Sequence, residues 1–321
     1  MTRTLRVLVN WQPEGIERIA SMPGVDLRTA ADRAETLAQI PEVEVAFVGL
    51  FDAEILAAAH RLSWLHCGAA GVEYCLFPEF VASSVLFTCS KPCFDVTAAE
   101  HAMAVILAFS RRLHLDWRHR PGRPWKWAKP GGLLEGGSFP QELAGKTVGI
   151  IGFGGMGQEL ARRAAAFGMR IVALARRERP DPEPAHKLLT GGGLEELLRE
   201  SDFVVLATPL TSATRGLLGE REFAAMKPEA CFVDLSGRPA LYDQAALTTA
   251  LHAGRLGGAS IQIPVPPDDS PLWNVPDLLP SFHRVVSTEE LRRVTDLFCE
   301  NLRRYQACEE LLGLVDRSAG Y

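Results

Sequence analysis

Short apolar runs alternate with stretches of helical character along the first ninety residues of the chain. The runs Leu5–Val9, Val45–Gly49, Ser63–Cys67 and Val85–Cys89 have the length and continuity of buried strands. Between them, the patterns at Pro13–Ser21, Asp52–Ala59 and Gly71–Phe77 predict helices. Strands that alternate with helices in this way form a parallel sheet covered on both faces.

A long apolar helix, predicted over Val96–Leu113, separates this series from a second one. It is apolar all round, so we expect it to be buried between domains or subunits. A Pro/Gly/Trp-rich loop follows at 120–137, and Trp125 and Trp127 within it are expected to pack against a partner.

The second series begins at Lys146 and repeats the alternation of strands and helices. A Pro-rich loop is predicted over Pro264–Pro280, and an amphipathic helix over Thr288–Cys308 closes the pattern. The predicted elements of the second series are the strands Thr147–Ile151, Arg170–Ala175, Phe203–Ala207, Ala230–Leu235 and Ala259–Ile263, and the helices Met156–Phe167, Leu194–Glu200 and Gln244–Ala253. The whole pattern is that of an α/β protein with two doubly wound parallel sheets.

Composition narrows the classes of function. The 321 residues are 47% hydrophobic and 23% charged, and 34 basic against 39 acidic side chains give a net charge of −5. A mildly acidic surface gives no basis for binding nucleic acid or an anionic membrane. No stretch is long and apolar enough for a membrane span. The seven cysteines include no CxxC pair, so we expect free thiols in the cytoplasm and no metal site.

The sharpest motif is Gly152-Phe153-Gly154-Gly155-Met156-Gly157, a G-x-G-x-x-G spacing. It follows an apolar strand and opens a helix, which is the context that gives this spacing meaning. The first glycine permits the turn, the second lets the backbone approach a pyrophosphate, and the third lets the helix pack close to the strand. The helix N-terminus then offers N–H groups to the phosphates. The motif predicts a dinucleotide site.

The end of the next strand indicates which dinucleotide is preferred. A site for NAD(H) usually has an acidic residue there for the ribose 2′-hydroxyl, but this chain has Ala175 followed by Arg176 and Arg177. Arginine pairs well with a 2′-phosphate. The sequence therefore favours NADP(H), with NAD(H) as the alternative.

With these motifs in hand, the chain resembles the D-isomer-specific 2-hydroxyacid dehydrogenase family over nearly its whole length. The segments that carry the likeness are WLHCGAAGVE from Trp64, Ala99-Glu100-His101, LAGKTVGIIGFGGMG from Leu143, SDFVVLATPLT from Ser201, Met226-Lys-Pro, Ser270-Pro-Leu-Trp273 and the terminal segment from Val315 to Tyr321.

The resemblance implies a Rossmann-type cofactor domain at 98–284, inserted into a discontinuous, flavodoxin-like substrate domain made of 1–97 and 285–321. It implies a cleft in which hydride passes between nicotinamide and a 2-oxo or 2-hydroxy acid, and a homodimer. The N–H groups of Ala70, Gly71 and Val72 would hold the substrate carboxylate. Thr208, Pro209, Leu235 and Gln262 would contact the cofactor.

The family's three catalytic side chains match this chain unevenly. His283, in Pro280-Ser-Phe-His, stands at the place of the histidine that gives its proton to the developing alkoxide. The carboxylate-binding arginine is displaced, because the segment reads Ser236-Gly237-Arg238 where the family has Arg-Gly. Arg238 is the candidate when the chain is aligned from Asp243 backwards.

No carboxylate stands at the place of the family's glutamate, which raises the pKa of the histidine, and Gln262 takes the place of an aspartate. Asp268 or Asp269 could fold back to serve instead, but nothing in the sequence requires it. Three departures around one reaction centre leave several functions open. The leading one is an NAD(P)-dependent reductase of 2-oxo acids. The others are a cofactor-binding protein without turnover that acts as sensor, scaffold or regulatory partner, and a different chemistry in the same site.

Overall fold

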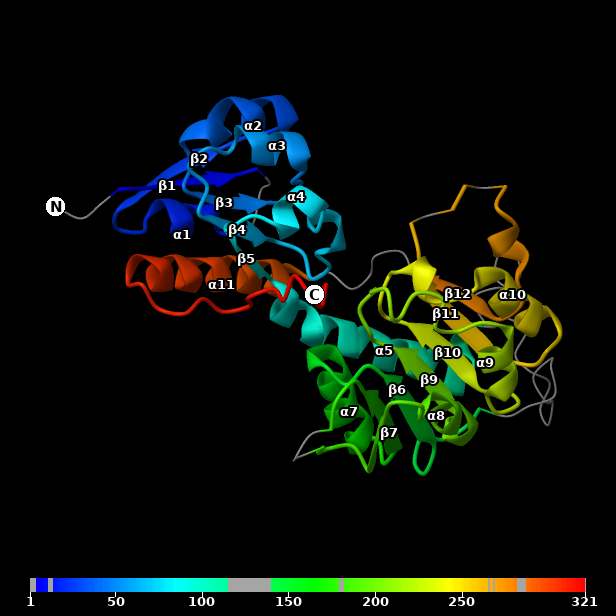
Figure 1. Cartoon of the computed structure of the whole chain (residues 1–321). Coiled ribbons are helices and arrows are strands. Elements are labelled where there is room, and N and C mark those ends of the chain that lie inside the picture. The colour runs from blue at the N-terminus through cyan, green and yellow to red at the C-terminus, as the bar shows by residue number, and fades with distance from the viewer. Residues whose placement is uncertain are drawn as a thin grey trace, which may run out of the picture. The chain divides into compact units, whose positions relative to one another are not determined.

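The computed structural model describes residues 4–10, 14–114, 140–178, 182–264, 266–267, 269–281 and 287–320. The chain divides into two compact units (Figure 1). Unit 1 combines Met1–Thr97 with Val286–Tyr321, and unit 2 is Ala98–Val285. Trp125 and Trp127 lie outside the described residues.

Unit 1 is built on a five-stranded sheet with the order β2-β1-β3-β4-β5, in which all neighbouring strands are parallel. This is the order of the flavodoxin-like doubly wound fold. Its strands are β1 (Leu5–Val9), β2 (Val25–Thr29), β3 (Val45–Val48), β4 (Trp64–Cys67) and β5 (Leu86–Cys89). Its helices are α1 (Ile16–Ala20), α2 (Arg33–Gln39), α3 (Ala53–Ala58), α4 (Pro78–Val81) and α11 (Thr288–Gln306).

The alternation of side chains along the strands of unit 1 fills two cores, one on each face of the sheet. On one face Leu8 and Leu65 pack with Ile55 of α3 and Phe80 of α4. The other face is covered by α1 and α11, and its core includes Val7, Phe47, Trp64, Ile19, Val294, Phe298 and Leu302. Part of this core therefore comes from a helix distant in sequence, and unit 1 is discontinuous.

Unit 2 is built on a seven-stranded parallel sheet with the order β12-β11-β10-β9-β6-β7-β8. The chain reverses direction across the sheet between β8 and β9, which places the switch point of a Rossmann fold next to β6. Its strands are β6 (Thr147–Ile151), β7 (Arg170–Ala175), β8 (Lys187–Thr190), β9 (Phe203–Leu206), β10 (Cys231–Asp234), β11 (Gly258–Gln262) and β12 (Leu278–Ser281). Its helices are α5 (Asp95–Ser110, which begins in the last residues of unit 1), α7 (Gly155–Ala166), α8 (Leu194–Glu200), α9 (Glu220–Ala225) and α10 (Gln244–His252).

The apolar helix α5 belongs to the core of unit 2. Ala102, Ile106 and Phe109 pack with the β6 residues Val148 and Ile150. The expectation that no stretch is long and apolar enough to cross a membrane is wrong by length and composition alone, because the described segment Lys91–Ser110 has a window of 18 residues with a mean hydropathy of 1.3. However, 56% of that window is buried inside the protein. Because its apolar residues pack against a sheet, we assign α5 to the core.

The architecture confirms the predicted fold class, while several local expectations are wrong. The segment Gly71–Phe77 is not a helix and contains only the 3₁₀ turn Glu73–Cys75. The expected loop Pro264–Pro280 contains the start of strand β12 and a 3₁₀ turn, Pro271–Asn274. The remaining elements that the sequence did not predict are β2, α2, α4, β8 and α9.

Candidate functional site

The glycine-rich turn joins β6 to α7, and Gly152 is the residue that makes the turn. Its φ is +104°, a conformation that side-chain-bearing residues rarely adopt. A Cβ on this residue would lie 2.6 Å from the carbonyl oxygen of Ala207 and 2.9 Å from the nitrogen of Thr208. The end of β9 therefore passes directly beside the turn, and no side chain fits between them.

The other two glycines of the motif differ from each other in what surrounds them. A Cβ on Gly157 would lie 2.3 Å from the carbonyl oxygen of Gly152, so α7 packs against the turn more closely than any side chain allows. A Cβ on Gly154 would have no described atom within 4 Å. Gly157 therefore allows α7 to pack closely against the turn, and Gly154 leaves the backbone accessible to a ligand.

The N-terminus of α7 completes this turn. Gly154 is the N-cap and brings no side chain to cap the helix, so the first N–H groups of α7 keep their capacity for an anion. Gly155 and Met156 begin the helix and are half-buried, whereas Phe153 is buried in the core. The geometry fits a dinucleotide pyrophosphate, since the backbone is accessible and positively polarised where a phosphate would lie.

The other predicted cofactor residues follow the strands beside β6. Because all strands of this sheet are parallel, their carboxyl ends lie along one edge. Thr208 and Pro209 follow β9, and Leu235 follows β10, where its N–H bonds to the carbonyl of Leu206 at 3.0 Å. Thr214, which the sequence analysis missed, fixes the loop after β9 because its hydroxyl donates to the carbonyl of Pro209 at 2.7 Å.

Arg176 and Arg177 come directly after β7 at the same edge of the sheet, and both are exposed. The last residue of the strand is Ala175, so no carboxylate stands at the place where an acidic residue would meet a ribose 2′-hydroxyl. Two exposed arginine residues thus follow the second strand of unit 2.

Arg238 lies on a turn after β10 that is stabilised by hydrogen bonds to the buried carboxylate of Asp234. Asp234, the last residue of β10, is fully buried, and its Oδ1 accepts hydrogen bonds from the N–H of Ser236 at 2.7 Å and from its hydroxyl at 2.5 Å. The N–H of Arg238 donates to the hydroxyl oxygen of Ser236 at 3.1 Å. Burial raises the pKa of Asp234. The brace fixes the backbone of Arg238 at the carboxyl end of β10, and the sequence analysis did not foresee it.

Gln262 ends β11 and lies beside this turn. A Cβ on Gly237, whose φ is +61°, would be 3.2 Å from Oε1 of Gln262, so the glycine makes room for the amide. The side chain is 6% exposed, and its Nε2 has no hydrogen-bond partner among the described residues. A buried amide donor left unpaired is costly, which marks this position as one that a bound group would complete.

His283 lies outside the described residues, but the strand that precedes it is described. Ser281, the last residue of β12, bonds through its hydroxyl to Nε2 of His101 at 2.5 Å. This contact ties the end of β12 to α5, and burial lowers the pKa of His101, which favours the neutral ring. Glu100, beside it on α5, pairs with Arg163 at 3.4 Å. Both side chains thus have partners within unit 2.

The expected substrate loop belongs to unit 1. Ala70 and Gly71 are half-buried in the segment after β4, and Val72 is buried where the 3₁₀ turn Glu73–Cys75 begins. His66, which lies on β4 just before this loop, is fully buried in the core. It bonds to the hydroxyls of Thr88 at 2.7 Å and Ser90 at 3.0 Å, and burial lowers its pKa to about 3. His66 is therefore a neutral core residue.

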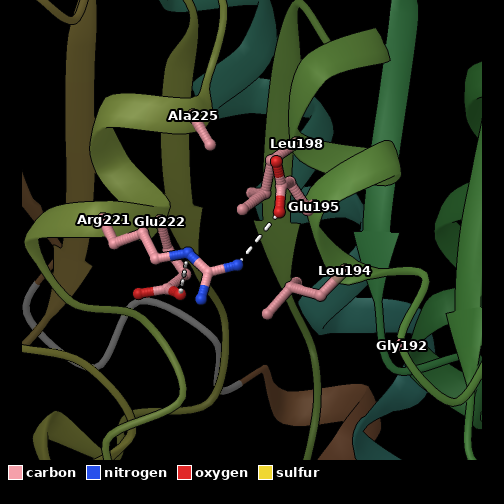
Figure 2. A pocket seen from close by; sticks show the side chains of 7 residues that line it. All are labelled: Gly192, Leu194, Glu195, Leu198, Arg221, Glu222 and Ala225. Atoms are coloured by element: carbon pink, nitrogen blue, oxygen red, sulfur yellow. Dashed lines mark hydrogen bonds and ion pairs between the residues drawn. The ribbon is translucent and has the colours of Figure 1, made fainter.

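A surface pocket lies apart from all of these residues, between α8 and α9 of unit 2. Figure 2 shows the charged pair Arg221–Glu195, at 3.0 Å, across it, with Leu194 nearby. None of its lining residues belongs to the predicted site, and the pair is well exposed. Among the described residues, no group of three or more His, Cys, Asp or Glu side chains is placed to hold a metal ion.

Comparison with known proteins identifies the class that this fold and turn define. Residues 103–284 match the family model "D-isomer specific 2-hydroxyacid dehydrogenase, NAD binding domain". The chain belongs to the D-isomer specific 2-hydroxyacid dehydrogenase family, and its middle is an NAD-binding domain, as the sequence predicted.

Two relatives and one solved structure show how far the likeness extends. The chain is 38% identical over 214 residues to a glyoxylate reductase of Thermococcus gammatolerans, a match that covers 66% of this chain and 63% of that protein's length. It is 34% identical over 274 residues to a glyoxylate reductase of Korarchaeum cryptofilum, covering 83% and 80%. A D-isomer specific 2-hydroxyacid dehydrogenase of Xanthobacter autotrophicus Py2, solved with NADPH and MES, aligns with a TM-score of 0.81 and 25% identity over 99% of this chain and 100% of that one.

Proposed function

We propose that this protein is an NADP(H)-preferring reductase that transfers a hydride to C2 of a small 2-oxo acid and yields the 2-hydroxy acid. The observation that carries the proposal is the turn at Gly152–Gly157. Two of its glycines stand where no side chain fits, and the third leaves the backbone open at a helix N-terminus. Membership of the family and relatives named glyoxylate reductase support the substrate class.

In this proposal the chain's own residues bind and orient the cofactor. The N–H groups at the start of α7 hold the pyrophosphate, with Gly154 allowing the approach. Thr208, Pro209 and Leu235 line the edge of the sheet beside the turn. The unpaired Nε2 of Gln262 donates to the nicotinamide carboxamide. Bound there, the nicotinamide supplies the hydride.

Arg176 and Arg177 are proposed to select NADP(H), because both are exposed after β7 and no acid ends that strand. We expect Arg176→Ala/Arg177→Ala to weaken NADPH binding by about tenfold or more, the loss of at least one charge-assisted hydrogen bond, and to change NADH binding little. Titration of cofactor fluorescence measures both affinities. Arg221→Ala, an exposed arginine at the remote pocket, is the matched control. An unchanged NADPH affinity in the double variant contradicts the assignment.

Arg238 and His283 are proposed as the groups that act on the substrate. The guanidinium of Arg238 pairs with the carboxylate and polarises the carbonyl, while the imidazolium of His283 gives its proton to the alkoxide oxygen as the hydride arrives. N–H groups of Ala70, Gly71 and Val72 would hold the carboxylate as well. We expect Arg238→Lys to raise KM and His283→Asn to lower kcat, and an unchanged rate in His283→Asn would remove His283 from the mechanism.

The first experiment follows oxidation of NADPH, and separately of NADH, with glyoxylate, hydroxypyruvate and phenylpyruvate from acidic to neutral pH. The acid in this mechanism is an imidazolium, which becomes more abundant as the pH falls through the range in which histidine ordinarily titrates, ~6.5. We therefore expect the rate to rise as the pH is lowered from 8 towards about 6. Tight NADPH binding with no turnover at any pH would contradict the proposal and leave the binding-protein hypothesis.

We further propose a homodimer located in the cytoplasm. All seven cysteines are free thiols, which suits a reducing compartment. The expectation of a dimer comes from the family resemblance and the long apolar helix. Sedimentation at micromolar concentration measures the mass, and a monomer there would contradict it.

A further inference from the structure

The first turn of helix α11 contains a glutamate that departs from the pattern of its own sequence. The segment Ser287-Thr288-Glu289-Glu290 is a capping box, in which the serine hydroxyl and the last carboxylate each accept a hydrogen bond from the other residue's backbone N–H. The structure shows half of this arrangement, because the N–H of Glu290 donates to the hydroxyl oxygen of Ser287 at 3.1 Å. The carboxylate of Glu290 does not accept a bond in return.

The side chain of Glu290 is buried instead. The residue is 0% exposed, and neither of its carboxylate oxygens has a hydrogen-bond partner among the described residues. Its neighbour Glu289 is exposed. Buried polar groups are normally hydrogen-bonded, and a buried carboxylate without a partner is costly in its ionised form. The position of Glu290 therefore favours the neutral acid, and burial raises its pKa to about 7.

The surroundings of Glu290 bring the two parts of unit 1 together. The 3₁₀ turn Lys91–Phe94 packs against α11. Arg293 follows Glu290 by one turn of the helix. Its Nε and Nη2 donate to the carbonyl of Cys93 at 3.1 and 2.9 Å, and Nη2 also donates to the hydroxyl of Thr97 at 3.4 Å. The guanidinium thus binds the opposite segment and makes no hydrogen bond to the carboxylate beside it.

Few other groups near Glu290 can change its charge. The hydroxyl of Thr97 and the positive charge of Arg293 both lower the pKa of Glu290, but burial outweighs them. Within the described part of the chain, the remaining ionisable groups around it are Cys93 and, next to Cys93, Asp95 at the start of α5. Burial raises the pKa of Cys93 to about 12, so this thiol stays neutral between pH 5 and 8.

Both connections between the two units leave unit 1 at this cluster. The first part of unit 1 ends at Thr97, and its second part begins at Val286, just ahead of α11. Arg293 joins these two places, because it lies on α11 and bonds to Cys93 and Thr97. The backbone at both connections is therefore held in place for as long as α11 and the segment Cys93–Thr97 stay packed together.

We propose that neutral Glu290 keeps α11 packed against Cys93–Thr97 and that loss of its proton opens this contact, so that both connections loosen as the solution approaches neutral pH. The ionised carboxylate regains its hydration only when the contact opens, whereas the neutral acid loses little by staying buried. This inference does not depend on the proposed reductase activity.

The direction of the pH effect follows from linkage. The pKa of Glu290 is raised from 4.5 to about 7 in the closed contact, so the closed form binds the proton more tightly than the open form. Its stabilising effect is complete below pH 4.5 and is lost as the pH rises towards 7. Over that range the equilibrium constant for opening should rise by up to about tenfold per pH unit, and it should level off above pH 7.

Hydrogen exchange of the full chain without ligand, from pH 5 to 8, measures this opening once each rate is corrected for the intrinsic pH dependence of exchange. The reporters are the amides of Cys93 and Leu291, which donate to the carbonyls of Ser90 at 2.9 Å and Ser287 at 3.2 Å. We expect their opening constants to rise and then level off near pH 7. The amides of β6, in unit 2, should show no such rise.

Glu290→Gln keeps the shape of the side chain but cannot ionise, so its opening constants should not depend on pH in this way. The matched control is Glu289→Gln, which changes the exposed neighbour and should behave as the parent. Opening that is independent of pH in the parent, or an equal rise in Glu290→Gln, overturns the proposal.

A second variant keeps the test decisive if Glu290→Gln does not fold. Arg293→Gln removes the positive charge that favours ionised Glu290. The pH at which the opening constant levels off should therefore move upwards in this variant. If it stayed at the parent value, Glu290 would not be the group that controls the contact.

Discussion

Gly152 and Gly154 are two residues apart, yet the structure predicts opposite consequences for the same substitution. In Gly152→Ala, the new Cβ meets the Ala207 carbonyl oxygen at 2.6 Å on a backbone with φ +104°. Backbone strain at such a conformation costs about 1–3 kcal/mol, and overpacking against rigid atoms costs about 1–3 kcal/mol more. The expected loss is about 2–6 kcal/mol, a large share of the ~5–15 kcal/mol that stabilises a typical domain.

Gly154→Ala adds the same atom where no described atom lies within 4 Å, on a backbone with φ −80°. The folded chain should lose at most about 1 kcal/mol, from the poorer N-cap. If the backbone of Gly154 approaches a pyrophosphate as proposed, the new methyl group should hinder that approach, and we expect NADPH affinity to fall by about tenfold or more, equal to ~1.4 kcal/mol.

Thermal unfolding without ligand and NADPH titration separate the two effects. A unit of this size shifts its Tm by about 2–4 °C per kcal/mol, so Gly152→Ala should lower the Tm by at least about 4 °C. Gly154→Ala should unfold near the parent temperature but bind poorly. If Gly154→Ala bound NADPH normally, or if Gly152→Ala kept the parent Tm, the reasoning from the turn geometry would be refuted.

Two further predictions concern unit 1. The guanidinium of Arg317 donates to the carbonyls of Ser83 at 2.7 Å and Phe80 at 2.9 Å and lies 4.6 Å from the centre of the Phe80 ring, so Arg317→Ala should destabilise this unit by about 2–3 kcal/mol in urea unfolding. Arg317→Lys should recover little of the lost stability, because an ammonium cannot reproduce the planar set of donors with which the guanidinium reaches several carbonyls. Full recovery would contradict the role assigned to these hydrogen bonds. For His66, burial lowers the folded-state pKa to about 3 from 6.5, so below pH 6.5 the unfolded chain binds a proton that the folded chain does not. Stability should therefore fall as the pH drops from 6.5 to 5, by up to about 1.4 kcal/mol per pH unit from this residue, and His66→Gln should flatten the slope, whereas the exposed His60→Gln should not.

The strands that the sequence failed to predict share one property, which is their place at the edge of a sheet. β2, β8 and β12 are three of the four edge strands, and each is only partly buried. Asp26 and Arg28 interrupt β2, and Pro280 lies within β12, where an edge tolerates a residue without an N–H. Interior strands such as Thr147–Ile151 and Arg170–Ala175 are largely buried, consist mostly of apolar residues, and were predicted to the residue.

In the candidate site, too, some features could be predicted from the sequence and others could not. The glycine-rich turn is a local motif, so its spacing, together with the strand before it and the helix after it, predicted it. The brace from Asp234 to Ser236 and the fit of Gly237 against Gln262 depend on how neighbouring strand ends meet, and the sequence carries no local sign of that contact. His66 shows that a polar residue beside a site motif can be a core residue, because its two ring nitrogens bond to two buried hydroxyls.

The discontinuity of unit 1 sets an order for folding during synthesis. One face of its sheet receives Val294, Phe298 and Leu302 from α11, which leaves the ribosome only after every strand of unit 2 has been made. Until then the side chains of Val7, Phe47 and Trp64 lack the helix that buries them in the finished protein. Domains usually fold in the order in which they are synthesised, but here the middle of the chain can complete its core before the beginning does. During synthesis, the apolar face of the N-terminal sheet is therefore the surface on which we expect a chaperone to be needed most to prevent aggregation.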